Sequence, residues 1–220
     1  MAIGLGKMFG FDFEENFKYP YAATSVTDFW RRWHISLTVW FRDYLYIPLG
    51  ENCCSKIRWL RSFFVVWLLA GLWHGASWNF VLWGLFYAVI LLFEKQIFDK
   101  VFKKIPSIFG WVYMFLMANV GWLLFRVNSL GDLRYILKSF VSPQISLADY
   151  LGNNFSLAHY IIFVILGLIF MFSIVRKLYD KFINYPFGRV VIDLVLLSLF
   201  VLSISALISS VYNPFIYFRF

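Results

Sequence analysis

The feature that most constrains this chain is a long apolar run, residues 63–93, which is interrupted once at residues 73–79. A helix needs about 20 apolar residues to cross a bilayer, so the run is too long for one upright span and too short for two. The interruption reads WHGASWN and contains His74. Ionisable groups at membrane depth are costly and usually face a cavity or a pathway. Because several polar or small residues cluster here, we favour a functional role for His74 over the alternative that it only packs.

The composition of the chain is that of an integral membrane protein. Of its 220 residues, 61% are hydrophobic and 15% are charged, whereas soluble domains average about 45–50% apolar and about 25% charged residues. The net charge of +8 comes from short basic runs between apolar segments. Membrane topology accounts for such runs, so we expect contact with membrane lipid and none with nucleic acid.

Further apolar segments predict an all-α, polytopic transmembrane fold, with a single membrane domain over residues 1–220. The other predicted spans are 108–125, 159–175 and 190–211. The connections 94–107 and 176–189 carry most of the lysine and arginine, so the positive-inside rule places both in the cytoplasm. The connection 127–157, with a short predicted helix, then lies outside. We therefore expect a multi-pass protein of the cell's inner (cytoplasmic) membrane.

The sequence allows two paths for the interrupted run through the membrane. The loop before residue 63 is also basic. If this loop is cytoplasmic, the run enters and leaves the membrane on the same side, as a broken or re-entrant segment with His74 at depth. Irregular backbone at that depth is tolerated where it lines a cavity or is buried in protein. If the loop lies outside, the run is one long, tilted or kinked span.

An aromatic, amphipathic helix is predicted from about residue 27 to about residue 46. Ser25 and Asp28 have the spacing of a capping box, and Pro48 ends the helix. Six apolar residues recur at helical spacing and define one broad face, namely Trp30, Trp33, Leu37, Trp40, Phe41 and Tyr44. The segment is too polar to span, so we expect it to lie at the membrane interface. His34 in this helix is either an ordinary interfacial residue or part of a site.

The residues that remain for chemistry are His34 and His74. The sequence has no phosphate-binding glycine loop, no cysteine and histidine spacing typical of a metal site, and no nucleophile elbow. No pair of carboxylates stands out by spacing. A partly desolvated histidine can accept a proton from an alcohol at neutral pH. This points to transfer of a group onto a hydroxyl.

Three blocks of the chain stand out, namely DFWRRWHISL (28–37), WFRDYLYIPL (40–49) and GLWHGASWNF (71–80), in that order. They resemble the membrane-bound O-acyltransferase family, in its bacterial branch of alginate O-acetyltransferases. The ending FIYFRF (215–220) is also similar to that branch. The resemblance covers essentially the whole chain as the C-terminal half of the family pattern. We therefore expect further spans to belong to the complete enzyme.

The resemblance implies roles for particular residues. His74 matches the catalytic histidine of the family, and His34 matches the second histidine of this branch. The expected substrate-binding residues are Trp73, Trp78, Asn79, Arg31 and Arg32. For the two arginines, contact with a phosphate or carboxylate and plain interfacial anchoring are equally expected.

The resemblance also implies substrates and partners. No bound cofactor and no metal are expected, and the acyl donor is acetyl-CoA or an acyl carrier. The acceptor is a hydroxyl of an extracytoplasmic polysaccharide, with a periplasmic or extracellular acyltransferase as a further partner. The alternatives are D-alanyl transfer to teichoic acid, a transporter or scaffold subunit without catalysis, and an inactive fragment. The lack of recognisable carboxylates in the spans argues against transport.

Overall fold

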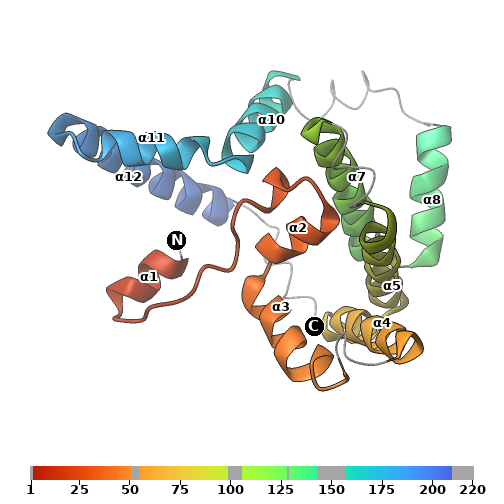
Figure 1. Ribbon diagram of the computed structural model, residues 1–220. Helices are drawn as coiled ribbons and strands as arrows, with labels where there is room; N and C mark the ends of the chain where they lie inside the picture. Colours follow the sequence, from red (N-terminus) through yellow and green to blue (C-terminus); the bar gives the residue numbers. More distant parts are fainter. Residues whose placement is uncertain (1, 51–54, 99–105, 128, 143–156, 210–220) are drawn as a thin grey trace. The chain divides into compact units, whose positions relative to one another are not determined.

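The computed structural model describes residues 2–50, 55–98, 106–127, 129–142 and 157–209, and within these ranges it contains helices and no strands (Figure 1). The chain divides into two compact units, residues 1–160 and 161–220. The fold is all-α, as predicted. The expectation of a single membrane domain stays a prediction.

The interrupted apolar run folds as two helices that pack against each other. Helix α4 spans Lys56–Trp73 and helix α5 spans Trp78–Phe93, so the predicted break is confirmed. Gly71 and Gly84 bring the two backbones together, because a Cβ at either position would meet a carbonyl oxygen of the other helix. The chain therefore turns back on itself at residues 74–77. A single long span over residues 63–93 is wrong.

Three helices of the described chain are long and apolar enough to cross a membrane. They are Trp78–Gln96, Ser107–Arg126 and Pro186–Ser205. A further pair, Ile161–Met171 and Ile174–Phe182, makes up to four if it counts as one span, and its two parts are bent by 71°. These helices make the protein polytopic. They belong to α5, α7 (Ser107–Arg126), α10 (Leu157–Met171), α11 (Ile174–Phe182) and α12 (Pro186–Ser209).

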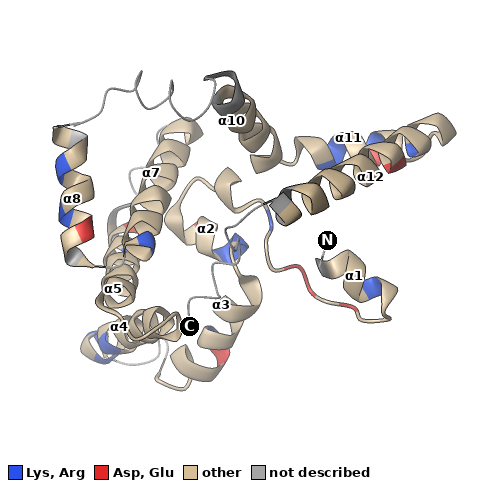
Figure 2. Cartoon of the chain, turned by 180° about the vertical axis from the view of Figure 1, so that it is seen from behind, with Lys and Arg blue, Asp and Glu red and all other residues tan. Residues whose placement is uncertain are grey.

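The basic connection after the third predicted span is helical in its first part. Helix α11 contains Arg176, Lys177 and Lys181 together with apolar residues, so it is strongly amphipathic. Figure 2 shows charged residues on α11 and on α8 (Leu130–Val141), whereas α10 has none. Helix α8 confirms the short helix that was predicted in the connection 127–157.

The predicted helix over residues 27–46 is broken in two. Helix α2 ends at Arg32 (Val26–Arg32), and helix α3 begins at Ile35 (Ile35–Phe41). A π-helical turn, Arg42–Tyr46, follows. Between α2 and α3, His34 has left-handed backbone angles, φ 48° and ψ 55°, which a continuous right-handed helix does not allow.

This break also divides the single aromatic face that was predicted, and the aromatic residues on its two sides differ in burial. The side chains of Trp40 and Tyr44 are 52% and 71% exposed. Trp33, in contrast, is half-buried and packs against the core of α2 and α7. The break at His34 rotates α3 relative to α2, so residues at helical spacing across it no longer share a face.

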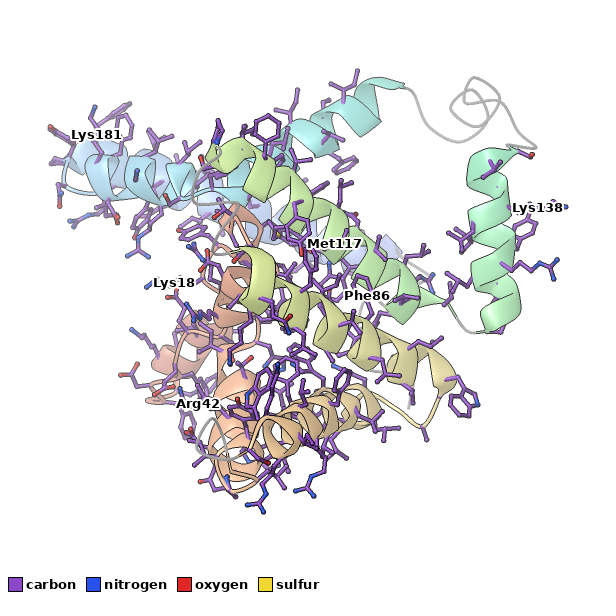
Figure 3. All side chains as sticks on the ribbon, turned by 45° about the vertical axis from the view of Figure 1, so that its right-hand side comes forward. Lys18, Arg42, Phe86, Met117, Lys138 and Lys181 are labelled. Carbon is purple, nitrogen blue, oxygen red and sulfur yellow. The ribbon has the colours of Figure 1, made fainter. Side chains whose placement is uncertain are left out.

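The core of the first unit lies where α2 meets α5 and α7. One buried cluster consists of Ala23, Phe29, Met114 and Ala118, and a second of Val26, Trp83 and Tyr87. In Figure 3, Phe86 and Met117 lie between α5 and α7, where they pack against the second cluster. Gly121 of α7 is required for this packing, because a Cβ there would collide with the Tyr87 hydroxyl. The core thus fixes α2 against α5 and α7.

Candidate active site

Trp73, the last residue of α4, contacts both candidate histidines. Its ring centroid is 4.9 Å from that of His74 and 6.1 Å from that of His34, and both pairs meet edge to face. The structure therefore brings together two histidines that are far apart in the sequence. His34 comes from the break between α2 and α3, and His74 from the turn between α4 and α5.

The imidazole of His74 is surrounded by aromatic rings from three helices. Trp83 of α5 and Phe125 of α7 meet it edge to face, at centroid distances of 5.3 and 5.0 Å. Phe80 lies at 6.1 Å. We call these three residues, together with Trp73, the aromatic cage. Its members replace water around the imidazole with apolar surface, which favours the neutral form of the ring.

The backbone of the turn is shaped by Gly75. This residue has a φ of +150°, and a Cβ there would collide with the ring of Phe80. The backbone N–H of His74 donates to the carbonyl of Gly71 at 3.0 Å, which continues the last turn of α4. Gly75 thus allows the chain to leave α4 directly after His74 while Phe80 stays in the aromatic cage.

The surroundings of both histidines favour the neutral form of the ring. Both residues lie outside the candidate spans. Burial, together with a smaller effect of the nearby His34, lowers the pKa of His74 to about 4. Burial also lowers the pKa of His34. A neutral imidazole has a nitrogen lone pair that can accept a proton, so both rings have the protonation state that a general base requires.

A buried carboxylate joins the helix before His34 to the end of α5. Glu94 is 3% exposed. It accepts hydrogen bonds from the backbone N–H of Val26 at 2.6 Å and of Thr27 at 2.8 Å, and from the Thr27 hydroxyl at 2.6 Å. Ser25 accepts from the N–H of Asp28 at 3.0 Å. Together these groups satisfy the free N–H groups in the first turn of α2.

Glu94 corrects the expectation that the spans lack carboxylates. It lies within the candidate span Trp78–Gln96. Its oxygens bind the start of α2, so the structure explains this carboxylate as a helix cap. Within the described chain, no three histidine, cysteine or carboxylate side chains come together as metal ligands would.

The other predicted site residues lie at different depths. Trp78 is 75% exposed at the start of α5. Asn79 is buried, and its Nδ2 donates to the carbonyl of Phe125 at 3.3 Å. This bond ties the turn after His74 to the end of α7. Arg31 is exposed on α2, whereas Arg32 is paired with Asp28, with Nη2 and Oδ2 2.8 Å apart. The substrate-binding roles of all five residues stay predictions.

Sequence reasoning missed most of the surroundings of His74. Phe125 lies on another helix, and no spacing in the sequence connects it with residue 74. Trp83 is distinguishable only as one aromatic among many in an apolar helix. Glu94 is one carboxylate among several, and no local pattern points to its partner 68 residues away. His159 is predicted to be an interfacial residue near the end of the span 159–175, and its side chain lies outside the described residues.

Comparison with known proteins gives consistent matches. A profile described as "MBOAT, membrane-bound O-acyltransferase family" matches residues 1–131. A probable alginate O-acetylase from Pseudomonas putida is 36% identical over 241 aligned residues, which are 100% of this chain and 49% of that protein. A probable alginate O-acetylase from Azotobacter vinelandii is 48% identical over 59% of this chain and 26% of its own length. A peptidoglycan O-acetyltransferase from Helicobacter pylori is 38% identical over 64% of this chain and 27% of its own length. The chain thus spans about half the length of the relative that it matches throughout.

Proposed function

Because the chain belongs to the membrane-bound O-acyltransferase family, we propose that it carries the histidine centre of an enzyme that moves an acetyl group onto a hydroxyl of an extracytoplasmic polysaccharide. The observation that carries this proposal is the packing of the His74 imidazole inside the aromatic cage, with His34 also in contact with Trp73. The relatives, which are named as a probable alginate O-acetylase and a peptidoglycan O-acetyltransferase, support the choice of acceptor.

In the proposed reaction, His74 acts as general base. It removes the proton of the acceptor hydroxyl while the oxygen attacks the carbonyl carbon of an acyl thioester. The new C–O bond forms, the C–S bond breaks, and the proton passes from His74 to the leaving thiolate. The products are an O-acetyl ester and a free thiol, so atoms and charge balance. Acetyl-CoA and an acyl carrier both supply such a thioester.

The apolar surroundings of His74 set a condition on this step. An imidazole with a pKa of about 4 is fully neutral at pH 7 but is a weak base in the empty site. The negative charge that develops on the attacking oxygen raises the proton affinity of the ring beside it. Proton transfer is therefore coupled to attack, and little imidazolium forms before an acceptor is bound. His34 is proposed to orient the acceptor or assist the transfer across Trp73.

The location and partners follow from the same proposal. The enzyme acts in the inner membrane, with the basic residues of 176–189 in the cytoplasm, where the donor is made. The acetyl group leaves on the opposite side, to the polysaccharide directly or through a partner acyltransferase.

The test measures the transfer of labelled acetyl from acetyl-CoA to polysaccharide by membranes that contain the chain. The chain is assayed by itself and together with a second polypeptide that supplies the rest of a full-length relative. His74→Asn keeps a similar size and a hydrogen-bonding amide but cannot accept a proton. It should lower transfer per inserted molecule by about 10²–10⁴-fold, the contribution of a general base. His159→Asn is the matched control. Near-normal transfer by His74→Asn contradicts the proposed role.

A further inference from the structure

The helix that follows His34 begins without a cap from its own sequence. His34 occupies the residue position before α3, where serine, threonine, aspartate or asparagine normally accept from the first free N–H groups. Its side chain makes no such bond. An imidazole that capped α3 would use up a ring nitrogen and could not point elsewhere.

Asn16, from the segment before α2, supplies the missing cap. Its backbone carbonyl accepts from the N–H of Ile35 at 3.0 Å. Its side-chain Oδ1 accepts from the N–H of Ser36 at 2.9 Å and from the Ser36 hydroxyl at 2.7 Å. One residue therefore satisfies the first two N–H groups of α3 and fixes Ser36 as well.

The chain around Asn16 holds His34 from the other side too. The N–H of Lys18 donates to the carbonyl of Arg32 at 2.9 Å, and Phe17 forms a bridge with Trp33. Residues 16–18 thus run beside residues 32–36 and clamp the left-handed turn at His34. The ring of Phe17 lies 6.0 Å from that of His34, which also contacts Trp73.

Because Asn16 caps α3, the side chain of His34 is not needed as a cap. Its Nδ1 is buried and makes no hydrogen bond to any described residue. Asn16 and Ser36 lie toward the surface, where a hydrogen bond adds little to stability because water competes for the same groups. The bonds of Asn16 are therefore better suited to fixing geometry than to holding the fold together.

We propose that Asn16 is a positioning residue for His34, which caps α3 in its place and so aims the imidazole at Trp73 and the acceptor. This proposal rests on the proposed function, in which His34 assists transfer. The role requires an acceptor oxygen at the position of Oδ1. It does not require the amide nitrogen.

The first experiment compares variants of Asn16 in the acetyl-transfer assay. Asn16→Leu keeps the volume but removes the acceptor, and should lower kcat by up to about 10²-fold through misplacement of His34, with KM for acetyl-CoA and folded yield unchanged. Asn16→Asp keeps an acceptor oxygen and should restore kcat. Glu15→Gln, at the exposed neighbouring position, is the control. Equal loss in Asn16→Leu and Asn16→Asp overturns the proposal.

The second experiment does not depend on acetyl transfer. In a His74→Asn, His159→Asn background, His34 is the remaining histidine, and its carbethoxylation by diethyl pyrocarbonate is followed by mass spectrometry against pH. Asn16→Leu should speed modification and move its midpoint up toward about 6.5, the value of a solvated histidine. Ser36→Ala should cause a smaller shift in the same direction. If Asn16→Leu lowers folded yield, Ser36→Ala is the variant that is compared with the unchanged Asn16–Ser36 pair.

The two experiments separate the possible failures. Unchanged reactivity of His34 in both Asn16→Leu and Ser36→Ala overturns the positioning role. If the unchanged protein transfers no acetyl group in either setting, the proposed function fails, while the reactivity of His34 still decides whether Asn16 positions it.

Discussion

Glu94 and Val26, 68 residues apart in the sequence, are joined by a buried hydrogen bond of 2.6 Å between the carboxylate and the backbone N–H. The same carboxylate binds both polar hydrogens of Thr27. The end of α5 therefore determines where α2 begins, and α2 leads directly to His34.

Replacing Glu94 tests this connection. Glu94→Leu should leave two N–H groups and one hydroxyl buried without an acceptor, and each unsatisfied group costs about 1–3 kcal/mol. We expect a large loss of folded yield and of thermal stability in detergent. Glu94→Gln keeps one acceptor oxygen and should lose less. Gln96→Ala, two residues further on and exposed, serves as control, and equal stability of Glu94→Leu and Gln96→Ala would contradict the capping role.

The lowered pKa of His74 predicts a dependence of stability on pH. In the folded chain its pKa is about 4, against about 6.5 in an unfolded chain. Between these values the unfolded chain binds more protons, so the free energy of unfolding decreases as the pH falls through this window. The thermal midpoint in detergent should drop from pH 7 to pH 4.5, and it should drop less in His74→Asn. His34, whose pKa is also lowered, contributes with the same sign and remains in both proteins.

Activity should follow the same ionisation. If His74 must be neutral to accept a proton, transfer should persist to a lower pH than an unperturbed histidine allows and should fall as the pKa is approached from above. The measurement is the acid limb of kcat/KM, which reports the free enzyme. A limb centred near 6.5 would show that the reacting histidine is solvated.

The close approach of α4 and α5 predicts the effect of a single methyl group. In Gly84→Ala, the Cβ would collide with the carbonyl of Trp67, so the helices must separate. Overpacking of this kind costs about 1–3 kcal/mol. Separation also disturbs the aromatic cage, so transfer per folded molecule should fall together with folded yield. Gly167→Ala, where a Cβ meets nothing within 4 Å, should be neutral.

The broken aromatic helix predicts different outcomes for two tryptophans that share a face in an ideal helix. Trp33→Asp should lower folded yield, because it puts a charge where an indole packs against Phe29 and Trp122, with ring centroids at 5.6 and 4.9 Å. Trp40→Asp, at an exposed position, should be tolerated. Fluorescence-detected size exclusion of the two variants measures this difference, and similar losses would indicate a continuous helix.

The sequence reveals the parts of this site that interrupt a pattern. His74 and its glycine stand out because polar residues break an apolar run, and the break is present in the structure. His34 lies inside an aromatic periodicity that continues across it, so the pattern predicts one helix. The left-handed turn that divides it depends on Asn16 and residues 17–18, which lie outside the periodic segment.

The remaining contacts are tertiary and carry no local signal. Glu94 reads as the first polar residue after a span, and its partners in α2 are reached only when α5 packs against that helix. Phe125 and Trp83 are apolar residues of apolar helices. Their place around His74 is set by the packing of α5 on α7, which sequence spacing does not encode.

The cap that Glu94 provides also orders events during synthesis. The ribosome makes His34 well before it makes residue 94, and until α5 has emerged the first N–H groups of α2 lack their acceptor. Until the end of the α4–α5 hairpin is present, the start of α2, which leads to His34, lacks the hydrogen bonds that Glu94 accepts. The contacts of both histidines with Trp73 therefore require the complete hairpin, and a nascent chain that ends before residue 94 lacks the carboxylate that holds α2 in place.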